Sequence, residues 1–236
     1  MPLKAPDKPS YNALKSLGLL ARSLADLLLP PACPICDELL DYSTEYICQT
    51  CRFGFDEFEP GSDRLGQPAI DSLHSAFFFG GSLQQGIIKL KLAGRRELAP
   101  YLARQLFATI LADWNWAKID MLVAVPLHKN KLYKRGFNQS ALLAREISSL
   151  SDCRFSAGIL RRIRNTPSQS SVGDPSSRSL NVKGAFDVKP KTNLKNRCVC
   201  LVDDVVTTGA TLSECARTLR KAGAAEVHAL TVARSV

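Results

Sequence analysis

The sequence predicts an α/β protein in which a mostly parallel sheet with flanking helices follows a small four-cysteine module. Three observations carry this prediction. Two C-x2-C pairs lie close together near the N-terminus. From about Asp71 onward, segments that are apolar on both faces alternate with helical patterns, which is typical of parallel sheets covered by helices. The stretch LVDDVVTTGATLSE (201–214) ends an apolar run with paired acids and a turn rich in threonine and glycine.

The composition is that of a globular protein with an uneven charge. The chain has 236 residues, 45% of them hydrophobic and 22% charged, which is enough for one or two domains. Up to Gly66 there are 6 basic and 10 acidic residues, and from Gln67 onward there are 25 basic and 12 acidic residues. The C-terminal part therefore suits phosphate-bearing ligands or nucleic acid, with a solvated basic surface as the alternative.

The N-terminal 30 residues predict an amphipathic helix. YNALKSLGLLARSLADLLLPP repeats apolar residues at helical spacing, and Arg22 and Asp26 interrupt it. It falls short of the roughly 18 apolar residues that a membrane span needs, and it does not read as a secretion signal. We expect a cytoplasmic protein with two domains: residues 1–60, which hold this helix and the cysteine module, and residues 67–236.

Four cysteines form the pattern C-x2-C-x11-C-x2-C: Cys33, Cys36, Cys48 and Cys51. The two-residue gap lets both thiolates of a pair face one centre, and two pairs make a closed, zinc-ribbon-like tetrahedral site. Structural zinc is the favoured occupant, and disulfides or redox thiols are the alternatives. The run FGFDEFEPGSDRLGQP that follows is typical of a linker. The other cysteines (Cys153, Cys198, Cys200 and Cys215) sit among apolar residues and are expected to be buried and reduced.

The body of the chain alternates strand and helix patterns in a fixed order. Strands are predicted at 75–81, 119–126, 198–204 and 225–233, and helices at 84–94, 97–114, 138–150 and 211–223. Thr211 and Glu214 fit a capping box at the start of the last helix, and Gly223 ends it. Ligands of such sheets bind at the carboxyl ends of the strands, which is where residues 203–211 fall.

The paired acids and the turn after them predict two different binding functions. The TTGAT turn lies at a helix N-terminus, where free N–H groups and threonine hydroxyls favour a phosphate. Asp203 and Asp204 accept hydrogen bonds only, so they suit hydroxyl groups or magnesium. A ligand that offers a phosphate beside vicinal hydroxyls is a ribose 5-phosphate. The motif is neither a P-loop nor a dinucleotide-binding glycine loop.

LVDDVVTTGAT closely resembles the phosphoribosyl pyrophosphate (PRPP) loop of type I phosphoribosyltransferases. In that family the acids contact the ribose 2- and 3-hydroxyls and the turn holds the 5-phosphate, with magnesium accompanying PRPP. The resemblance implies a type I phosphoribosyltransferase-like sheet in residues 67–236, with Asp203 and Asp204 as catalytic acids. It implies a PRPP-binding set of Asp203, Asp204, Thr207, Thr208, Gly209, Ala210 and Thr211.

A longer pattern resembles the ComF branch of this fold, also called the ComFC/GntX group. Its parts are the cysteine pairs, IIKLKLAG with Lys89 and Lys91, AVPLHKNKLYKRGFNQS, RRIRNTPSQS and RSLNVKGAF. The resemblance implies a pyrophosphate side and a lid made of Lys91, Pro126, His128, Arg135, Gly136, Asn138, Gln139, Thr166, Gln169, Arg178 and Asn181. Arg135 and Gly136 are expected at the start of a helix, and the long polar segment between Arg161 and Phe186 is expected to form the lid.

Two functions of different classes follow from the resemblance. The first is a protein that binds magnesium PRPP, or a ribose 5-phosphate, and serves competence-type DNA uptake or processing. The second is an active phosphoribosyltransferase, a pentosyl-group transferase of nucleotide or related metabolism, whose acceptor the sequence does not name. Single-stranded DNA and DNA-uptake proteins are the expected partners of the first. Tyr133 and Phe137 are the candidate stacking residues for DNA in the basic stretch, although Phe137 also fits the core.

Overall fold

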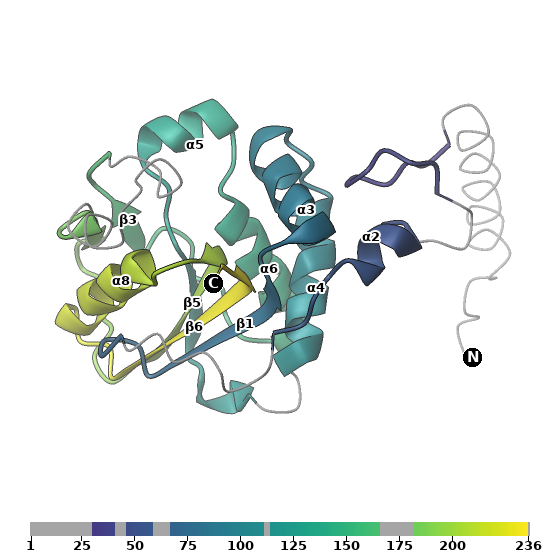
Figure 1. Cartoon of the computed structure of the whole chain (residues 1–236). Coiled ribbons are helices and arrows are strands. Elements are labelled where there is room, and N and C mark those ends of the chain that lie inside the picture. The colour runs from purple at the N-terminus through teal and green to yellow at the C-terminus, as the bar shows by residue number, and fades with distance from the viewer. Residues whose placement is uncertain (1–29, 41–45, 59–66, 111–113, 166–181, 236) are drawn as a thin grey trace, which may run out of the picture.

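Four parallel strands form the central sheet of the protein, shown in Figure 1. The computed structural model describes residues 30–40, 46–58, 67–110, 114–165 and 182–235. The strands are β1 (Ser72–Phe78), β2 (Met121–Ala124), β5 (Cys198–Val206) and β6 (Glu226–Arg234), in the spatial order β1-β6-β5-β2. Every neighbouring pair in this sheet is parallel, as the sequence predicts.

Helices cover both faces of this sheet. On one face, α3 (Gly81–Leu92), α4 (Leu98–Ile110) and α6 (Gln139–Ser151) share an apolar core with the strands. On the other face, α8 (Ala210–Lys221) buries its predicted apolar stripe against a second core. The two cores confirm the predicted helix–sheet–helix layering. Among the described residues, no helix is long and apolar enough to cross a membrane.

The boundaries around the paired acids differ from the sequence prediction. Strand β5 does not stop at the acids but continues to Val206. Helix α8 begins at Ala210, because Gly209 turns the chain in the left-handed region with φ 74° and serves as the N-cap. The capping box predicted from Thr211 and Glu214 is therefore wrong, and the Glu214 carboxylate accepts a hydrogen bond from the Gly184 N–H at 2.7 Å.

Several short elements lie in segments for which the sequence predicted neither a helix nor a strand. They are α2 (Gln49–Phe53), the 3-10 helix η1 (Trp116–Lys118), α5 (Lys129–Arg135) and the antiparallel pair β3 (Leu160–Arg162) and β4 (Phe186–Val188). Arg135 and Gly136 end α5 instead of starting a helix, since Gly136 has φ 77° and its N–H bonds to the Leu132 carbonyl.

The cysteine module packs directly on α3 and α4, as Figure 1 shows. Ile35 and Ile47 are buried in the same core as Leu83, Ile87 and Leu98. The following aromatic residues, which the sequence assigned to a linker, lie along β1: the Phe58 N–H donates to the Ala76 carbonyl at 2.9 Å, and the Phe78 N–H donates to the Asp56 carbonyl at 2.8 Å. The division into domains 1–60 and 67–236 remains a prediction, and the predicted N-terminal helix lies outside the described residues.

Candidate functional site

The paired acids lie near the carboxyl ends of β5 and β2. The two strands pair only as far as Val202, which lies opposite Ala124, so Asp203 and Asp204 stand just beyond their last pair. The helix after β5 packs on one face of the sheet, and the long helix after β2 packs on the other. When the helices that follow two neighbouring strands pack on opposite faces of the sheet, a crevice opens at the ends of these strands. Ligands usually bind there in sheets of this kind.

Asp203 and Asp204 have different surroundings. Asp203 is partly exposed, and its Oδ1 accepts hydrogen bonds from the Ser140 hydroxyl at 2.7 Å and from the Asp204 N–H at 2.9 Å. Asp204 is 4% exposed, and its Oδ1 lies 3.0 Å from the Lys91 ammonium. Its buried Oδ2 has no hydrogen-bond partner in the part of the chain that the structure describes. The site therefore holds one accessible and one buried carboxylate.

The proximity of the two carboxylates changes the acidity of Asp203. Burial raises the pKa of Asp203, and the negative charge of Asp204 adds to this effect. The hydrogen bond from Ser140 and the charge of Lys91 act in the opposite direction, and the pKa reaches about 7. Asp203 therefore changes its charge near neutral pH while no ligand is present.

Three half-buried cations lie around the acids in addition to Lys91. Burial lowers the pKa of the Arg135 guanidinium, and the charge of Asp204 opposes this. Burial likewise lowers the pKa of Arg162, and the negative charge of Asp203 opposes this. The pKa of Lys131 is lowered by burial and by the positive charges of Arg162 and Arg135. Cations that repel one another in a partly buried crevice favour the binding of an anion.

The segment after β2 is fixed to both strands and to α6. The Val125 N–H donates to the Val202 carbonyl at 3.0 Å, and the Asn138 amide donates to the Val125 carbonyl at 3.0 Å. Asn138 also caps α6 by accepting from the Ser140 N–H at 3.1 Å. Buried His128 caps α5 in the same way, accepting from the Asn130 N–H at 3.3 Å. These bonds set the position of the basic helix α5 relative to the acids.

A small cavity lies beside the turn between β5 and α8 and along the first turns of α8. Gln67 reaches the turn from a distant part of the chain and donates to the Thr208 carbonyl at 3.1 Å. This cavity of about 180 Å³ is lined by Gln67, Val182, Thr208, Ala210, Ser213, Glu214 and Arg217. The buried Ser213 hydroxyl has no partner among the described residues, so it is one donor that a ligand in this cavity could use.

The structure brings together most of the predicted site residues that it describes. Lys91 contacts Asp204, Arg135 bonds to the Gln139 side chain, and Asn138 ties α6 to the end of β2. Lys89, the other lysine of the family-like pair, turns away and contacts Asp37. Phe137 is buried, while Tyr133 is 91% exposed, so only Tyr133 is available for stacking. The lid and its residues Thr166, Gln169, Arg178 and Asn181 lie outside the described part.

Three residues that contact the site were missed by the sequence analysis. Ser140 follows the Asn-Gln pair of a predicted helix start and looked like an ordinary first-turn serine. Arg162 lies in the basic run RRIR, where no residue type marks it as a neighbour of the acids. Gln67 lies 141 positions before the Thr208 carbonyl that it contacts, and no local pattern marks such a pair.

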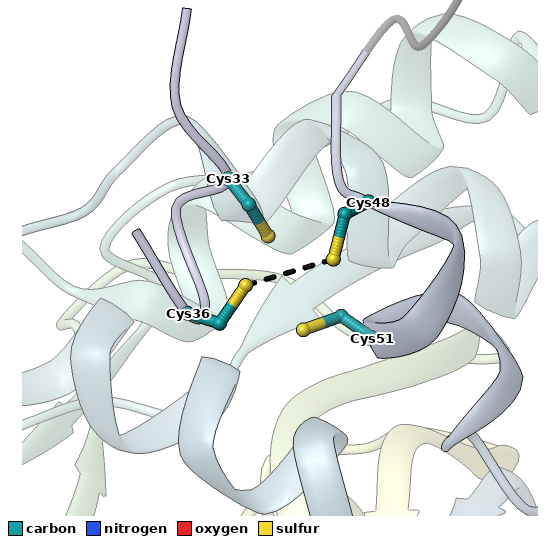
Figure 2. Close-up of side chains that lie close together, drawn as sticks. All are labelled: Cys33, Cys36, Cys48 and Cys51. Carbon is teal, nitrogen blue, oxygen red and sulfur yellow. Dashed lines mark hydrogen bonds between the residues drawn. The ribbon is translucent and has the colours of Figure 1, made fainter. Parts of the chain in front are cut away.

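The four predicted cysteine ligands converge on one point, as Figure 2 shows. Their sulfur atoms all lie within 4.8 Å of one another, and the Sγ atoms of Cys36 and Cys48 are 3.6 Å apart. A disulfide needs about 2.05 Å, whereas four sulfurs at about 2.3 Å from one metal are separated by roughly 3.8 Å. All eight cysteines are free thiols, and Cys153, Cys198, Cys200 and Cys215 are buried as predicted.

The four thiols differ in acidity: burial and hydrogen bonds with neighbouring thiols raise the pKa of Cys51, whereas the pKa of Cys33 is lowered. Burial acts to raise the pKa of Cys33, but N–H groups of Cys48, Cys36 and Ile35 outweigh it and lower this pKa to about 7. Cys33 and Cys51 are buried while Cys36 is exposed, so the centre is held at the surface of the module. The arrangement fits a tetrahedral metal site closed by four protein ligands.

Comparisons with known proteins cover the segment that holds the paired acids and, in one relative, nearly the whole chain. A family model described as "Phosphoribosyl transferase domain" matches residues 101–235. DNA utilization protein YhgH of Escherichia coli is 34% identical over 153 residues, 64% of this chain and 66% of that protein. Competence protein ComFC of Bacillus subtilis is 28% identical over 235 residues, 99% of this chain and 87% of that protein. The chain belongs to the ComF/YhgH family of phosphoribosyl transferase domain proteins.

Other matches are more distant or shorter. Competence protein F of Haemophilus influenzae is 35% identical over 117 residues, 49% of this chain and 51% of that protein. A glutamine PRPP amidotransferase from B. subtilis has a TM-score of 0.36 and 20% identity over 55% of this chain and 26% of that chain, a score too low to establish a common fold. The matched segment covers just under two thirds of the E. coli YhgH proteins.

Replacing Asp203 by Asn is expected to raise the free energy of unfolding at pH 8 by about 1–3 kcal/mol. The pKa of Asp203 is about 7 in the folded chain, against about 3.9 in an unfolded one. Below both values Asp203 is protonated in either state, so the difference between the two proteins vanishes. It grows between about pH 4 and pH 7, where Asp203 is ionised only in the unfolded state, and it stays constant above pH 7.

Urea unfolding of both proteins at pH 5, 6.5 and 8 measures this difference. Asp152→Asn, the same change at the far end of α6, corrects for the general loss of a carboxylate. A stabilisation that is equal at all three pH values would contradict the raised pKa of Asp203.

Proposed function

We propose that this protein binds PRPP with magnesium, or another ribose 5-phosphate, in the crevice at β5 and that it serves competence-type DNA uptake or processing. The observation that carries the proposal is the pairing of an accessible carboxylate, Asp203, with half-buried cations beside the N-terminus of α8. A ligand that presents hydroxyl groups and phosphates a few ångströms apart satisfies both sets of groups at once.

Each part of the ligand has a candidate partner in this arrangement. Asp203 accepts hydrogen bonds from ribose hydroxyls, and the turn 207–211 and the first N–H groups of α8 bind the 5-phosphate. Lys91, Arg135 and Arg162 face the pyrophosphate. Magnesium bound to PRPP would neutralise part of its charge. Since the ionised form of Asp203 binds hydroxyls and metal, affinity should increase as the pH rises through 7.

The Asp203→Asn variant is expected to bind magnesium PRPP at least about tenfold more weakly than the unchanged protein. Asn removes the negative charge that would accept hydrogen bonds from the ribose hydroxyls, and a hydrogen bond to a charged group is worth about 1.5–3 kcal/mol. Isothermal titration calorimetry measures the dissociation constant, and Asp152→Asn serves as the matched acid-to-amide control. Equal affinity of all three proteins, or no binding by a well-folded unchanged protein, would refute the proposed site.

The DNA role is supported by the surface of α5 and by the relatives. Tyr133 is 91% exposed on a helix that also carries Lys129 and Lys134, both exposed. An aromatic ring beside cations is the usual platform for single-stranded nucleic acid. The relatives bear the names "DNA utilization protein" and "Competence protein", and Figure 1 shows α5 at the edge of the molecule.

Tyr133→Ala is expected to weaken binding to a single-stranded oligonucleotide by about 5- to 100-fold, the range found for loss of one stacking contact. Fluorescence anisotropy at several salt concentrations measures this, and the salt dependence itself should change little because no charge is removed. Phe53→Ala removes an equally exposed ring from α2 and should leave binding unchanged. Equal effects of the two variants would exclude α5 as the DNA platform.

Active phosphoribosyl transfer is the second candidate function. It is supported by the acids together with Arg135 and Arg162, because the family match, residues 101–235, contains all of them. In this reaction the bond from ribose C1 to pyrophosphate breaks, a bond from C1 to a nucleophile forms, and pyrophosphate leaves. A screen for pyrophosphate release from PRPP with candidate acceptors separates transfer from binding alone.

We also propose that the cysteine cluster holds one structural zinc ion. Elemental analysis of the purified protein should then find about one zinc per chain. Cys36→Ser should lose the metal, whereas Cys153→Ser, at a buried cysteine outside the cluster, should keep it. A metal-free protein with four reactive thiols in 30–58 would favour redox chemistry instead.

A further inference from the structure

Helix α3 lies beside the cysteine module, as Figure 1 shows, and its Lys91 contacts Asp204 of β5. On the module side its contacts follow the length of the helix. At its start the Ser82 hydroxyl donates to the Cys51 carbonyl at 2.6 Å. In its middle Gly86 packs so closely that a Cβ atom there would lie 3.2 Å from Ile35 Cδ1. Near its end Lys89 reaches Asp37.

Asp37 is the contact between the cysteine pair and the end of α3. It follows Cys36 directly and has a left-handed backbone with φ 64°. Its two carboxylate oxygens accept from Lys89 Nζ at 2.5 Å and from Arg95 Nη2 at 2.7 Å. These hydrogen bonds and positive charges, that of Lys89 first, lower the pKa of Asp37. Asp37 therefore holds both the last turn of α3 and the loop after it.

The same short segment contacts the crevice on its other side. Lys91 Nζ lies 3.0 Å from Asp204 Oδ1. The Arg96 guanidinium lies 4.6 Å above the ring of Phe137, and its Nη2 lies 3.3 Å from the position of a Cβ at Gly136. Side chains two residues apart on an α-helix point in directions that differ by about 200°, so Lys89 and Lys91 lie on opposite sides of α3.

We propose that the cysteine module positions Lys91 and the loop 93–97 for ligand binding, with Asp37 as the positioning residue. Within this segment Leu92, Ala93, Gly94, Arg96 and Glu97 are exposed, so few buried contacts fix it apart from those to Asp37, Asp204 and Phe137. When Asp37 fixes Lys89 and Arg95, the end of α3 has fewer conformations available, so less entropy is lost when Lys91 pairs with Asp204. Occupation of the metal site would thereby strengthen the binding of an anion in the crevice. This inference rests on the proposed ligand function.

The Asp37→Asn variant tests the connection without disturbing the backbone, because Asn tolerates the left-handed conformation as well as Asp does. Its dissociation constant for magnesium PRPP, measured by calorimetry, should increase about three- to fivefold, as expected for loss of exposed ion pairs. Glu146→Gln removes the exposed ion pair with Arg104, away from α3, and should leave this constant unchanged. Zinc content is measured for each protein, and Lys89→Met repeats the test with the cysteine pair untouched.

A double-mutant comparison separates positioning from a general loss of stability. If Asp37 acts through Lys91, Asp37→Asn should change the affinity of a Lys91→Met protein by less than about 1.5-fold. An undiminished three- to fivefold effect in that background would overturn the role of Lys91.

Amide hydrogen exchange of peptides covering 87–96 supplies a readout that needs no ligand. Exchange there should accelerate about threefold or more in Asp37→Asn and after metal removal, but not in Glu146→Gln. Accelerated exchange in a protein that fails to bind PRPP would overturn the proposed function and leave the positioning role standing. Unchanged exchange would overturn the positioning role, whatever the affinity for PRPP.

Discussion

Two neighbouring carboxylates at the end of a buried strand are the constraint on which the site depends. Placing Asp203 and Asp204 side by side in a region of low dielectric is unfavourable unless other groups compensate their charge. The compensation comes from separate elements: Lys91 on α3, Ser140 on α6 and Arg162 on β3. The positions of these elements around β5 are therefore tied to the two acids, and the crevice is electrostatically organised before any ligand arrives.

The parallel sheet and its main helices could be predicted because each has a strong local pattern. The strand 198–206 is an unbroken apolar run up to the acids, and α8 repeats apolar residues at helical spacing. The exact start of α8 could not be predicted, because a left-handed Gly209 competes with a plausible capping box. Strands β3 and β4 have three residues each, and pairing between them is a long-range event that a short polar sequence does not mark.

Only those parts of the candidate site could be predicted whose residues are neighbours in the sequence. The acids and the threonine-rich turn are adjacent in sequence, so one pattern contains them. Ser140 and Arg162 reach Asp203 only through tertiary structure, and each has an ordinary local explanation. Lys89 and Lys91 look equivalent in sequence, yet one contacts the cysteine module and the other contacts the crevice. Only the direction of each side chain around α3 separates their roles.

The crevice carries more positive than negative charge. Four cations (Lys91, Lys131, Arg135 and Arg162) surround two carboxylates, and one of these carboxylates has a pKa of about 7. Burial of Lys131, Arg135 and Arg162 lowers their pKa values because a buried positive charge is unfavourable. An anionic ligand would compensate these charges and raise the pKa values again. A magnesium ion or hydroxyl groups beside Asp203 would also favour its ionised form. Binding of such a ligand should therefore release a proton from Asp203 near neutral pH, since the ligand and the proton compete for the same carboxylate.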